Sequence, residues 1–373
     1  MRRKILFVVG TRPEIIKTAP VIKVLEKQKA YQVKVCFTGQ HRTMVDQMLK
    51  DFALPVDFDL KIMKPNQLLS DIASRTLTRL KDIYGVFRPS LIFIQGDTTS
   101  ATATALSAFY EKLSVAHIEA GLRTYDKYQP YPEEINRVLI SRLADLHFAP
   151  TKQARENLIR EGVVPFTITL TGNTVVDALL YIKNARRQFL NPRLKNVPLN
   201  KKIILVTMHR RESFGKPIRN ICHALKSIAR QYKDVIIIYP VHLNPNVRAP
   251  VKNILSGIDN IWLLNPLHYR DLVLLMTRSY VILTDSGGIQ EEAPTFGKPV
   301  LVLREKTERP EGVDLGIARL VGANRKTIIT EVSRLLCFPE EYDKMVLDNR
   351  RKNPYGDGHA SERILRRLNK YFE

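Results

Sequence analysis

The sequence lacks most of the patterns that indicate a metal, a redox cofactor or a membrane helix. It has only three cysteines among 373 residues. Cys36, Cys222 and Cys337 lie far apart without a CxxC spacing, which argues against a zinc site and a disulfide framework. No uninterrupted apolar run approaches the roughly 18 residues of a membrane helix, and neither GxGxxG nor a Walker lysine loop is present. We therefore expect no cofactor, no metal, no membrane partner and a cytoplasmic location.

Acidic residues are few relative to basic ones. The chain has 59 Lys and Arg against 37 Asp and Glu, a formal net charge of +22, which is compatible with an anionic ligand or with nucleic acid. The basic residues are scattered, with concentrations near 350–352 and 363–370, and no basic run is interleaved with aromatic residues. We interpret most of this charge as solvated surface and expect no nucleic-acid partner, although a nucleic-acid-binding protein stays an alternative from another class.

Short apolar, β-branched runs alternate with amphipathic stretches, and this pattern occurs twice. It is typical of βα units and of a parallel sheet buried on both faces. The fold class is therefore α/β, with two doubly wound parallel-sheet domains. Strands are expected at 4–9, 32–38, 90–95, 114–119, 146–149 and 167–171, and again at 202–207, 235–239, 261–264, 280–284, 299–303 and 318–321.

The domain boundary is expected after residue 185. Residues 186–202 carry two prolines and many basic residues without periodicity, so they are the best candidate linker. We expect a first domain over 1–185 and a second over 186–373, with the final helix packing back on the first domain.

The polar residues that follow the strands of the first half are candidate reactive groups, because ligands of doubly wound sheets collect beyond the carboxyl ends of the strands. Arg12 and Lys17, at a helix start, could meet an anion; the alternative is a surface Arg and Lys. Asp97 and Glu119 end two adjacent strands and could share a proton. Helix N-capping is the structural alternative for Asp97, whereas Glu119 would need to be buried or paired.

A third group of acids lies at a helix start with the sequence YPEEINR. Glu133 and Glu134 occupy the first turn after Pro132. Helix-dipole stabilisation and an i,i+4 pair of Glu133 with Arg137 would account for these residues without any catalytic role. From the residues alone this structural interpretation is the favoured one.

In the second half, two strand ends predict a phosphate site. Residues 209–212, with the sequence HRRE, offer an imidazole and two guanidiniums, which suits a phosphate clamp; an ion-pair network with Glu212 is the alternative. Residues 284–292, with the sequence TDSGGIQEE, open a helix whose free N–H groups favour a diphosphate. Glu292 could accept hydrogen bonds from ribose hydroxyls.

The ordered set of motifs resembles one family over almost the whole chain. The motifs are GTRPEIIK, TGQHR, GDTT, HIEAGLRT, YPEEINR, TGNTVVDAL, HRRESFG, YPVHLNPNV, LTDSGGIQEEAP, TERPEG and NPYGDG. They are similar to those of the non-hydrolysing UDP-N-acetylglucosamine 2-epimerases, members of the glycosyltransferase-B-like superfamily. The resemblance implies two Rossmann-like domains facing a central cleft, a GT-B-like arrangement.

The resemblance also implies roles for individual residues. The catalytic positions are Asp97, Glu119, Glu133 and His209. The substrate-binding positions are Arg12, Lys17, Ser286, Gly287, Gly288, Glu292 and Arg309. The positions at which bacterial members bind a second substrate molecule as an allosteric activator are Gln40, Arg75, Glu134, Arg210 and His242. Thr43 departs from the pattern, because some members carry a longer polar residue in that regulatory pocket.

The implied activity is the reversible C2 epimerisation of UDP-N-acetylglucosamine to UDP-N-acetylmannosamine, an isomerase reaction. It would proceed through elimination of UDP to 2-acetamidoglucal and re-addition, with no cofactor. The resemblance also implies a homodimer and a supply of N-acetylmannosamine units for polysaccharide biosynthesis. A hydrolysing 2-epimerase, an epimerase of a modified UDP-sugar and a glycosyltransferase remain as alternatives of the same architecture.

Overall fold

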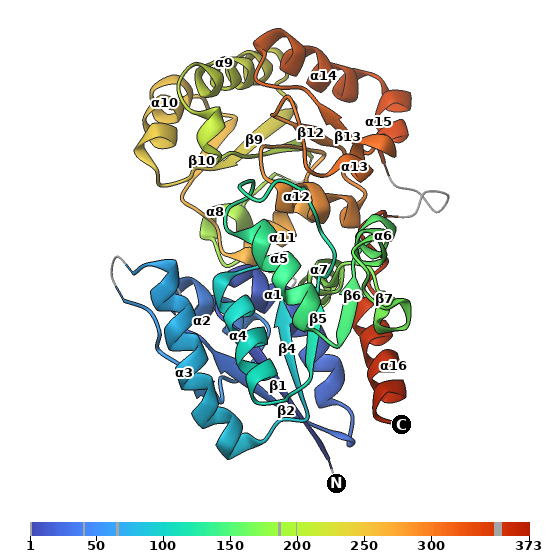
Figure 1. The fold of residues 1–373 in the computed structure, drawn as a ribbon. Helices are drawn as coiled ribbons and strands as arrows, with labels where there is room; N and C mark the ends of the chain where they lie inside the picture. Colours follow the sequence, from blue (N-terminus) through green and yellow to red (C-terminus); the bar gives the residue numbers. More distant parts are fainter. Residues whose placement is uncertain (1, 40–41, 65–66, 186–187, 199, 347–352) are drawn as a thin grey trace. The chain divides into compact units, whose positions relative to one another are not determined.

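The computed structural model describes residues 2–39, 42–64, 67–185, 188–198, 200–346 and 353–373 (Figure 1). The chain divides into two compact units, one formed by Met1–Tyr181 with Tyr355–Glu373 and the other by Ile182–Pro354. Each unit holds a parallel sheet, with seven strands in the first and six in the second. The expected α/β class with a parallel sheet in each half is thereby confirmed.

The first sheet is built from short apolar strands that are buried on both faces. Every residue of β4 (Leu91–Gln95) is buried, as are the last five residues of β1 (Arg3–Val9). Such continuous apolar runs are expected where helices cover both faces of a parallel sheet. The strand order is β3-β2-β1-β4-β5-β6-β7. The other strands are β2 (Tyr31–Phe37), β3 (Phe58–Asp59), β5 (Val115–Ile118), β6 (Leu146–Ala149) and β7 (Ile168–Leu170).

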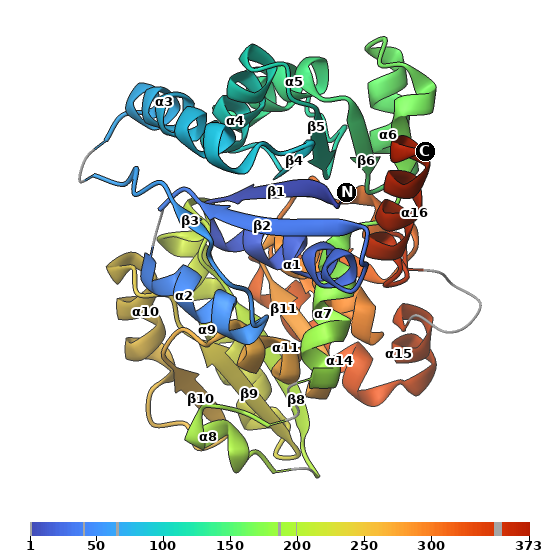
Figure 2. The same ribbon diagram turned by 90° about the horizontal axis from the view of Figure 1, so that it is seen from below.

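Helices cover both faces of this sheet, as Figure 2 shows with α3, α4 and α5 on one side and α1 and α7 on the other. The C-terminal helix packs against α1, and hydrogen bonds from Tyr31 to Asn369 (2.7 Å) and from Tyr371 to Ser114 (2.9 Å) attach it to the unit. The helices are α1 (Arg12–Glu26), α2 (Arg42–Asp51), α3 (Leu69–Phe87), α4 (Thr99–Tyr110), α5 (Glu133–Leu143), α6 (Lys152–Arg160), η1 (Pro165–Thr167), α7 (Thr174–Ala185) and α16 (Ala360–Phe372).

The second unit repeats the plan with the strand order β10-β9-β8-β11-β12-β13. Its core joins the inner faces of α9, α10 and α14 to the sheet. The strands are β8 (Lys202–Thr207), β9 (Val235–Pro240), β10 (Ile261–Leu264), β11 (Val281–Thr284), β12 (Val300–Val302) and β13 (Ala318–Leu320). The helices are α8 (Pro192–Lys195), η2 (Arg211–Ser213), α9 (Lys216–Gln231), α10 (Pro245–Leu255), α11 (Tyr269–Arg278), α12 (Gly287–Glu292), η3 (Ala293–Phe296), α13 (Pro310–Asp314), α14 (Arg325–Cys337) and α15 (Pro339–Met345).

All twelve expected strands occur within one or two residues of their expected bounds. The sequence did not predict β3, because this edge strand of two residues is too short to show a hydrophobic period.

Part of the expected linker is ordered on the second unit. It contains α8, and the N–H groups of Leu190 and Asn191 donate to the buried carboxylate of Asp271 at 2.7 and 2.9 Å.

Candidate functional site

Each sheet has one point at which the chain order reverses. In the first sheet the chain runs outward from β1 to β3 and then continues on the other side of β1 with β4. In the second sheet it runs from β8 to β10 and continues on the other side of β8 with β11. Ligands of open α/β sheets bind outside the carboxyl ends of the strands at such a reversal. The turns after β1, β4, β8 and β11 are therefore where a site is expected.

Glu14 joins the turns that follow β1 and β4. Its Oε2 accepts the N–H groups of Gly10 (2.5 Å) and Thr11 (2.7 Å). Its Oε1 accepts the hydroxyl of Thr98 at 2.6 Å, and Thr98 in turn caps α4. Burial raises the pKa of Glu14, against the opposing effect of these hydrogen bonds. Glu14 was not among the residues expected from the sequence, although its place three residues after Thr11 is a capping-box signal.

Glu14→Gln is expected to remove a pH dependence from the stability of the protein. Because the pKa of Glu14 is raised in the folded state, the folded chain keeps this proton at pH values where the unfolded chain has released it. The contribution of Glu14 is therefore fully present below the ordinary value of 4.5 and is lost as the pH rises through the folded-state pKa. Denaturant unfolding measured from pH 4.5 to about pH 8 gives the free energy of unfolding of both proteins. The value for the variant should rise relative to that of the parent as the pH rises. A difference in unfolding free energy that does not change with pH would contradict this assignment.

Glu119, directly after β5, is held by donors from α1, from β4 and from the turn before α7. The ammonium of Lys17 and the side-chain amide of Asn173 donate to its Oε1, and the amide of Gln95 donates to its Oε2. Its side chain is only 9% exposed. The structural interpretation required Glu119 to be buried or paired, and these contacts meet that requirement; they also fix a carboxylate beside the point at which the chain order reverses. Lys17 thus contacts a carboxylate of the protein itself, whereas the sequence suggested that it could meet an anionic ligand.

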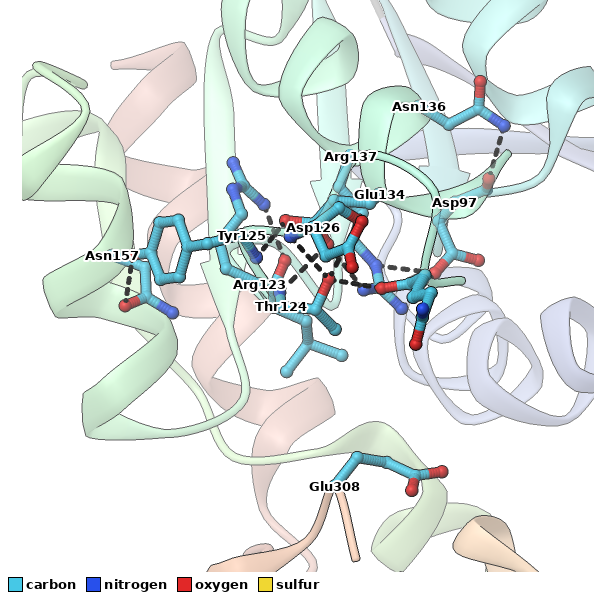
Figure 3. Close-up of polar contacts among 12 residues, drawn as sticks. Asp97, Arg123, Thr124, Tyr125, Asp126, Glu134, Asn136, Arg137, Asn157 and Glu308 are labelled. Atoms are coloured by element: carbon cyan, nitrogen blue, oxygen red, sulfur yellow. Dashed lines mark hydrogen bonds and ion pairs between the residues drawn. The ribbon is translucent and has the colours of Figure 1, made fainter. Parts of the chain in front are cut away.

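Asp97, directly after Gly96 at the end of β4, is not the N-cap of α4, because Thr98 takes that position. Its carboxylate pairs with Arg137 at 2.8 Å, and its backbone oxygen accepts the amide of Asn136 at 2.8 Å (Figure 3). The structural interpretation by N-capping is therefore wrong for Asp97. Asp97 and Glu119 follow the paired strands β4 and β5, so their backbones lie at the same edge of the sheet.

The acids at the start of α5 have different surroundings. Glu134 accepts the N–H groups of Thr124 (3.0 Å) and Tyr125 (2.9 Å) and pairs with Arg137 at 3.1 Å (Figure 3). Burial opposes its ionisation, but these donors outweigh burial and lower the pKa of Glu134. Glu133 differs: its Oε2 is buried and has no hydrogen-bond partner among the described residues. Arg137 pairs with Glu134 rather than with Glu133, so the expected i,i+4 pair is not among the ion pairs of the described chain.

The segment between Glu119 and α5 is held by a buried arginine. Arg123 donates through Nε and Nη2 to the carboxylate of Glu161, both at 2.7 Å, and through Nη2 to Ser141 at 2.9 Å. The hydroxyl of Tyr125 donates to Asn157 at 2.9 Å (Figure 3). These contacts fix the loop that begins with Glu119.

Asp285 organises the turn after β8 in the second unit. Its carboxylate is fully buried and accepts the N–H groups of His209 (3.1 Å) and Arg210 (3.0 Å) and the hydroxyl of Ser213 (2.9 Å). The imidazole of His209 lies 3.4 Å from the same carboxylate and 6.2 Å, between ring centroids, from that of His242. Burial lowers the pKa of His209, while Asp285 acts to raise it. Asp285 was not expected from the sequence as a site residue, although it lies in the TDSGG motif.

The start of α12 follows the same strand end as Asp285. Ser286 is the N-cap of α12, and its N–H donates to Thr284 at 2.9 Å. A Cβ at Gly287 would lie 3.1 Å from the carboxylate of Glu308 and 3.6 Å from the guanidinium of Arg210. Glycine at 287 therefore lets these charged groups lie close to the helix start.

Glu308 is the centre of an ion-pair cluster beside this helix. It pairs with Arg210 at 2.8 Å and with Arg304 at 2.6 Å, and Arg304 also pairs with Glu212 at 2.6 Å. Burial alone would raise the pKa of Glu308, but the two arginines outweigh it and lower the pKa to about 2. The alternative network of residues 209–212 exists in part, because Glu212 pairs with Arg304 and not with Arg210.

The remaining candidate residues are distributed over both units. Arg309 pairs with Glu291, and Gly288 and Glu292 lie within α12. Arg75 donates to the backbone oxygen of Ile62 at 3.0 Å. Arg12 is the first residue of α1. Gln40 lies outside the described residues.

No metal or membrane feature occurs in the described part of the chain. No group of three or more His, Cys, Asp or Glu side chains there is arranged to hold a metal ion. Across the same residues, no helix combines the length and the apolar character that crossing a bilayer requires. The candidate chemistry therefore consists of carboxylates in the first unit and of cationic groups with a helix start in the second.

Comparisons with known proteins identify relatives over the full length. A family model described as UDP-N-acetylglucosamine 2-epimerase matches residues 23–369. The UDP-N-acetylglucosamine 2-epimerase of Campylobacter jejuni is 50% identical over 374 residues, covering 98% of this chain and 97% of the relative.

Solved structures give the same result. The UDP-GlcNAc 2-epimerase of Neisseria meningitidis, bound to UDP-GlcNAc, is 46% identical with a TM-score of 0.87 and covers 98% of this chain and 100% of its own. A putative UDP-N-acetylglucosamine 2-epimerase from Listeria monocytogenes is 42% identical with a TM-score of 0.93, covering 100% and 97%. The glycotransferase of kitacinnamycin, 14% identical with a TM-score of 0.65 over 98% and 99%, shares the GT-B-like fold alone.

Proposed function

The chain belongs to the UDP-N-acetylglucosamine 2-epimerase family and catalyses epimerisation at C2 of UDP-N-acetylglucosamine, and we propose that it does so by elimination and re-addition of UDP. The observation that carries this proposal is the pair of carboxylates, Asp97 and Glu119, that follow the neighbouring strands β4 and β5. The product is UDP-N-acetylmannosamine.

The mechanism follows from the weak acidity of the C2 hydrogen. C2 lies beside no carbonyl group, so removing its proton alone would give a very unstable carbanion. If the bond from C1 to the UDP oxygen breaks as the proton leaves, the electron pair of the C–H bond forms the C1–C2 double bond of 2-acetamidoglucal. Return of a proton to the opposite face of C2 and of UDP to C1 restores the sugar nucleotide with inverted C2. No electron is gained or lost, so no nicotinamide is needed.

This sequence of steps requires at least two acid–base groups, on different sides of the sugar ring, and a stabilised leaving group. We assign the acid–base steps to Asp97, Glu119 and Glu133 of the first unit. The unpartnered Oε2 of Glu133 supports its inclusion, because an unsatisfied buried oxygen calls for a hydrogen-bond partner.

Binding of the diphosphate is assigned to cationic and N–H donor groups. In the second unit these are His209 and the start of α12, at Ser286 to Gly288, where backbone N–H groups favour a phosphate. Glu292 would accept hydrogen bonds from the ribose. The proposed substrate-binding set is completed by three basic residues. They are Arg309 in the second unit and Arg12 and Lys17 at the start of α1.

Deuterium incorporation tests the proposal. In deuterated water the product UDP-N-acetylmannosamine should carry one deuterium at C2, and the UDP-N-acetylglucosamine recovered at equilibrium should carry it as well. Mass spectrometry and proton NMR of the nucleotide-linked sugars measure this directly. Stoichiometric release of UDP and free N-acetylmannosamine would instead identify a hydrolysing enzyme, and epimerisation without deuterium at C2 would exclude the elimination.

We further propose that a second UDP-N-acetylglucosamine molecule acts as an activator. Arg210 and His242 support this, because both lie near residues that are assigned to the diphosphate. Arg210 pairs with Glu308 beside Gly287, and His242 lies beside His209. Gln40, Arg75 and Glu134 complete the proposed activator positions.

A homodimer in the cytoplasm is proposed as the working form. Exposed apolar side chains on α3 and α4 support the homodimer: Val86, Phe109 and Tyr110 are 78%, 59% and 66% exposed, and such side chains often mark protein interfaces. A cytoplasmic location fits three cysteines that are free thiols.

A further inference from the structure

The backbone at Glu119 is in a conformation that few residues adopt. Its φ is +69°, in the left-handed region that favours glycine. Such a conformation costs about 1 kcal/mol or more and persists where the surroundings hold it. A glutamate side chain also has several rotatable bonds, so local structure alone does not fix the position of its carboxylate. The contacts that reach this carboxylate from other elements therefore decide where it lies.

Gln95 supplies the first of these contacts. It is the last residue of β4 and is buried, and it lies in register with Ile118, the residue before Glu119. Its amide nitrogen donates to Oε2 of Glu119. Because both residues sit on paired strands of one sheet, this hydrogen bond ties the carboxylate to a rigid part of the fold.

Asn173 supplies the second contact, and a hydrogen bond to its side-chain oxygen orients its amide. Its Oδ1 accepts the N–H of Val175 at 3.0 Å at the start of α7, so its Nδ2 is the group that faces Glu119, 3.4 Å from Oε1. The backbone of Asn173 is itself held, because its N–H donates to the carbonyl of Tyr355 at 2.7 Å. A Cβ at Gly356 would lie 3.3 Å from that same nitrogen.

We propose that Gln95 and Asn173 are positioning residues of the epimerisation, which aim the carboxylate of Glu119 at the C2 proton. The inference rests on the proposed function, in which Glu119 is an acid–base group. Each carboxylate oxygen has two acceptor sites. Lys17 and Asn173 donate to Oε1, whereas among the described residues Oε2 accepts a hydrogen bond from Gln95 alone, so Oε2 is the oxygen with an acceptor site left for the proton. Lys17 supplies charge, and the two amides supply direction.

Two substitutions that keep the shape of the side chain test the roles of the two amides. Gln95→Met removes the donor and keeps the length of the side chain. Asn173→Asp keeps the oxygen that caps α7 and replaces the donor by a second negative oxygen facing Glu119. Because small displacements of a reacting group cost about 100-fold in rate, kcat should fall by about 100-fold in Gln95→Met and by about 10-fold in Asn173→Asp, with KM changed less than about threefold.

A pH profile separates a positioning role from a merely structural one. In Asn173→Asp the acidic limb of the kcat profile should move to higher pH, because two neighbouring carboxylates share a proton more readily than one. Gln231→Met, which removes an exposed amide that donates to Tyr232 at 3.1 Å, is the matched control and should behave as the parent protein.

The outcomes distinguish this inference from the proposed function. If Glu119→Gln is inactive while Gln95→Met and Asn173→Asp turn over at the parent rate, the positioning role is overturned and the proposed function stands. If the two variants lose kcat only in proportion to a lowered melting temperature, with an unmoved pH profile, their role is structural and the inference is likewise overturned. If Glu119→Gln keeps full turnover, the acid–base assignment itself fails.

Discussion

Glu119→Gln is expected to lower kcat by about 1,000-fold, the usual contribution of a positioned general acid or base. A glutamine fills the same space but cannot take a proton, so the elimination step loses its acceptor. The affinity for UDP should change little, because the diphosphate is assigned to other residues. Initial rates of UDP-N-acetylmannosamine formation and titration calorimetry with UDP measure the two effects.

Glu26→Gln is the control for loss of a carboxylate. Glu26 ends α1 and pairs with Lys23 at 3.2 Å, and its side chain is 34% exposed. Its loss should leave kcat unchanged, because exposed ion pairs contribute little. Turnover of Glu119→Gln at the rate of Glu26→Gln would remove Glu119 from the mechanism.

Asp285→Ala is expected to destabilise the second unit by about 4 kcal/mol and to weaken UDP binding at least about tenfold. The carboxylate of Asp285 is fully buried and accepts two backbone N–H groups and one hydroxyl. Alanine leaves these donors without an acceptor, and the turn that carries His209 loses its anchor. Denaturant unfolding and calorimetry with UDP give the two quantities.

Two milder variants separate stability from binding in this turn. Ser213→Ala removes one hydrogen bond to Asp285 and should cost about 1 kcal/mol of stability. His209→Ala removes an imidazole that is 46% exposed and is proposed to bind phosphate. UDP affinity should therefore fall with little change in stability. An Asp285→Ala protein as stable as the parent, or a His209→Ala protein with parental UDP affinity, would contradict these roles.

The strands were predictable because their signal is local. In β1, β4 and β8, β-branched and apolar residues form continuous runs, and such runs indicate strands covered on both faces whatever lies elsewhere in the chain. The edge strand β3 was not predicted, because two residues are too few to show a hydrophobic period. The helix at Pro192–Lys195, inside the expected linker, escaped for a similar reason, since four residues do not show helical periodicity.

The candidate site was predictable in its residue types but not in its pairings. The rule that ligands collect at strand ends is enough to select Asp97, Glu119 and His209 from the residue pattern alone. It could not show that Thr98 rather than Asp97 caps α4, because both residue types suit a cap. It also gave no reason to select Gln95. This residue ends an apolar strand, and only the contact of its amide with Glu119 sets it apart.

By itself the sequence determined which segments form strands and helices and which polar residues stand at the strand ends, because these follow from short-range patterns of apolar and turn-forming residues. Only the tertiary structure decided which side chains meet. Glu119 receives Lys17 from 102 residues away along the chain, and Asp285 receives the N–H of His209 from 76 residues away. Contacts between residues so far apart depend on the order and register of the strands, which no local pattern encodes.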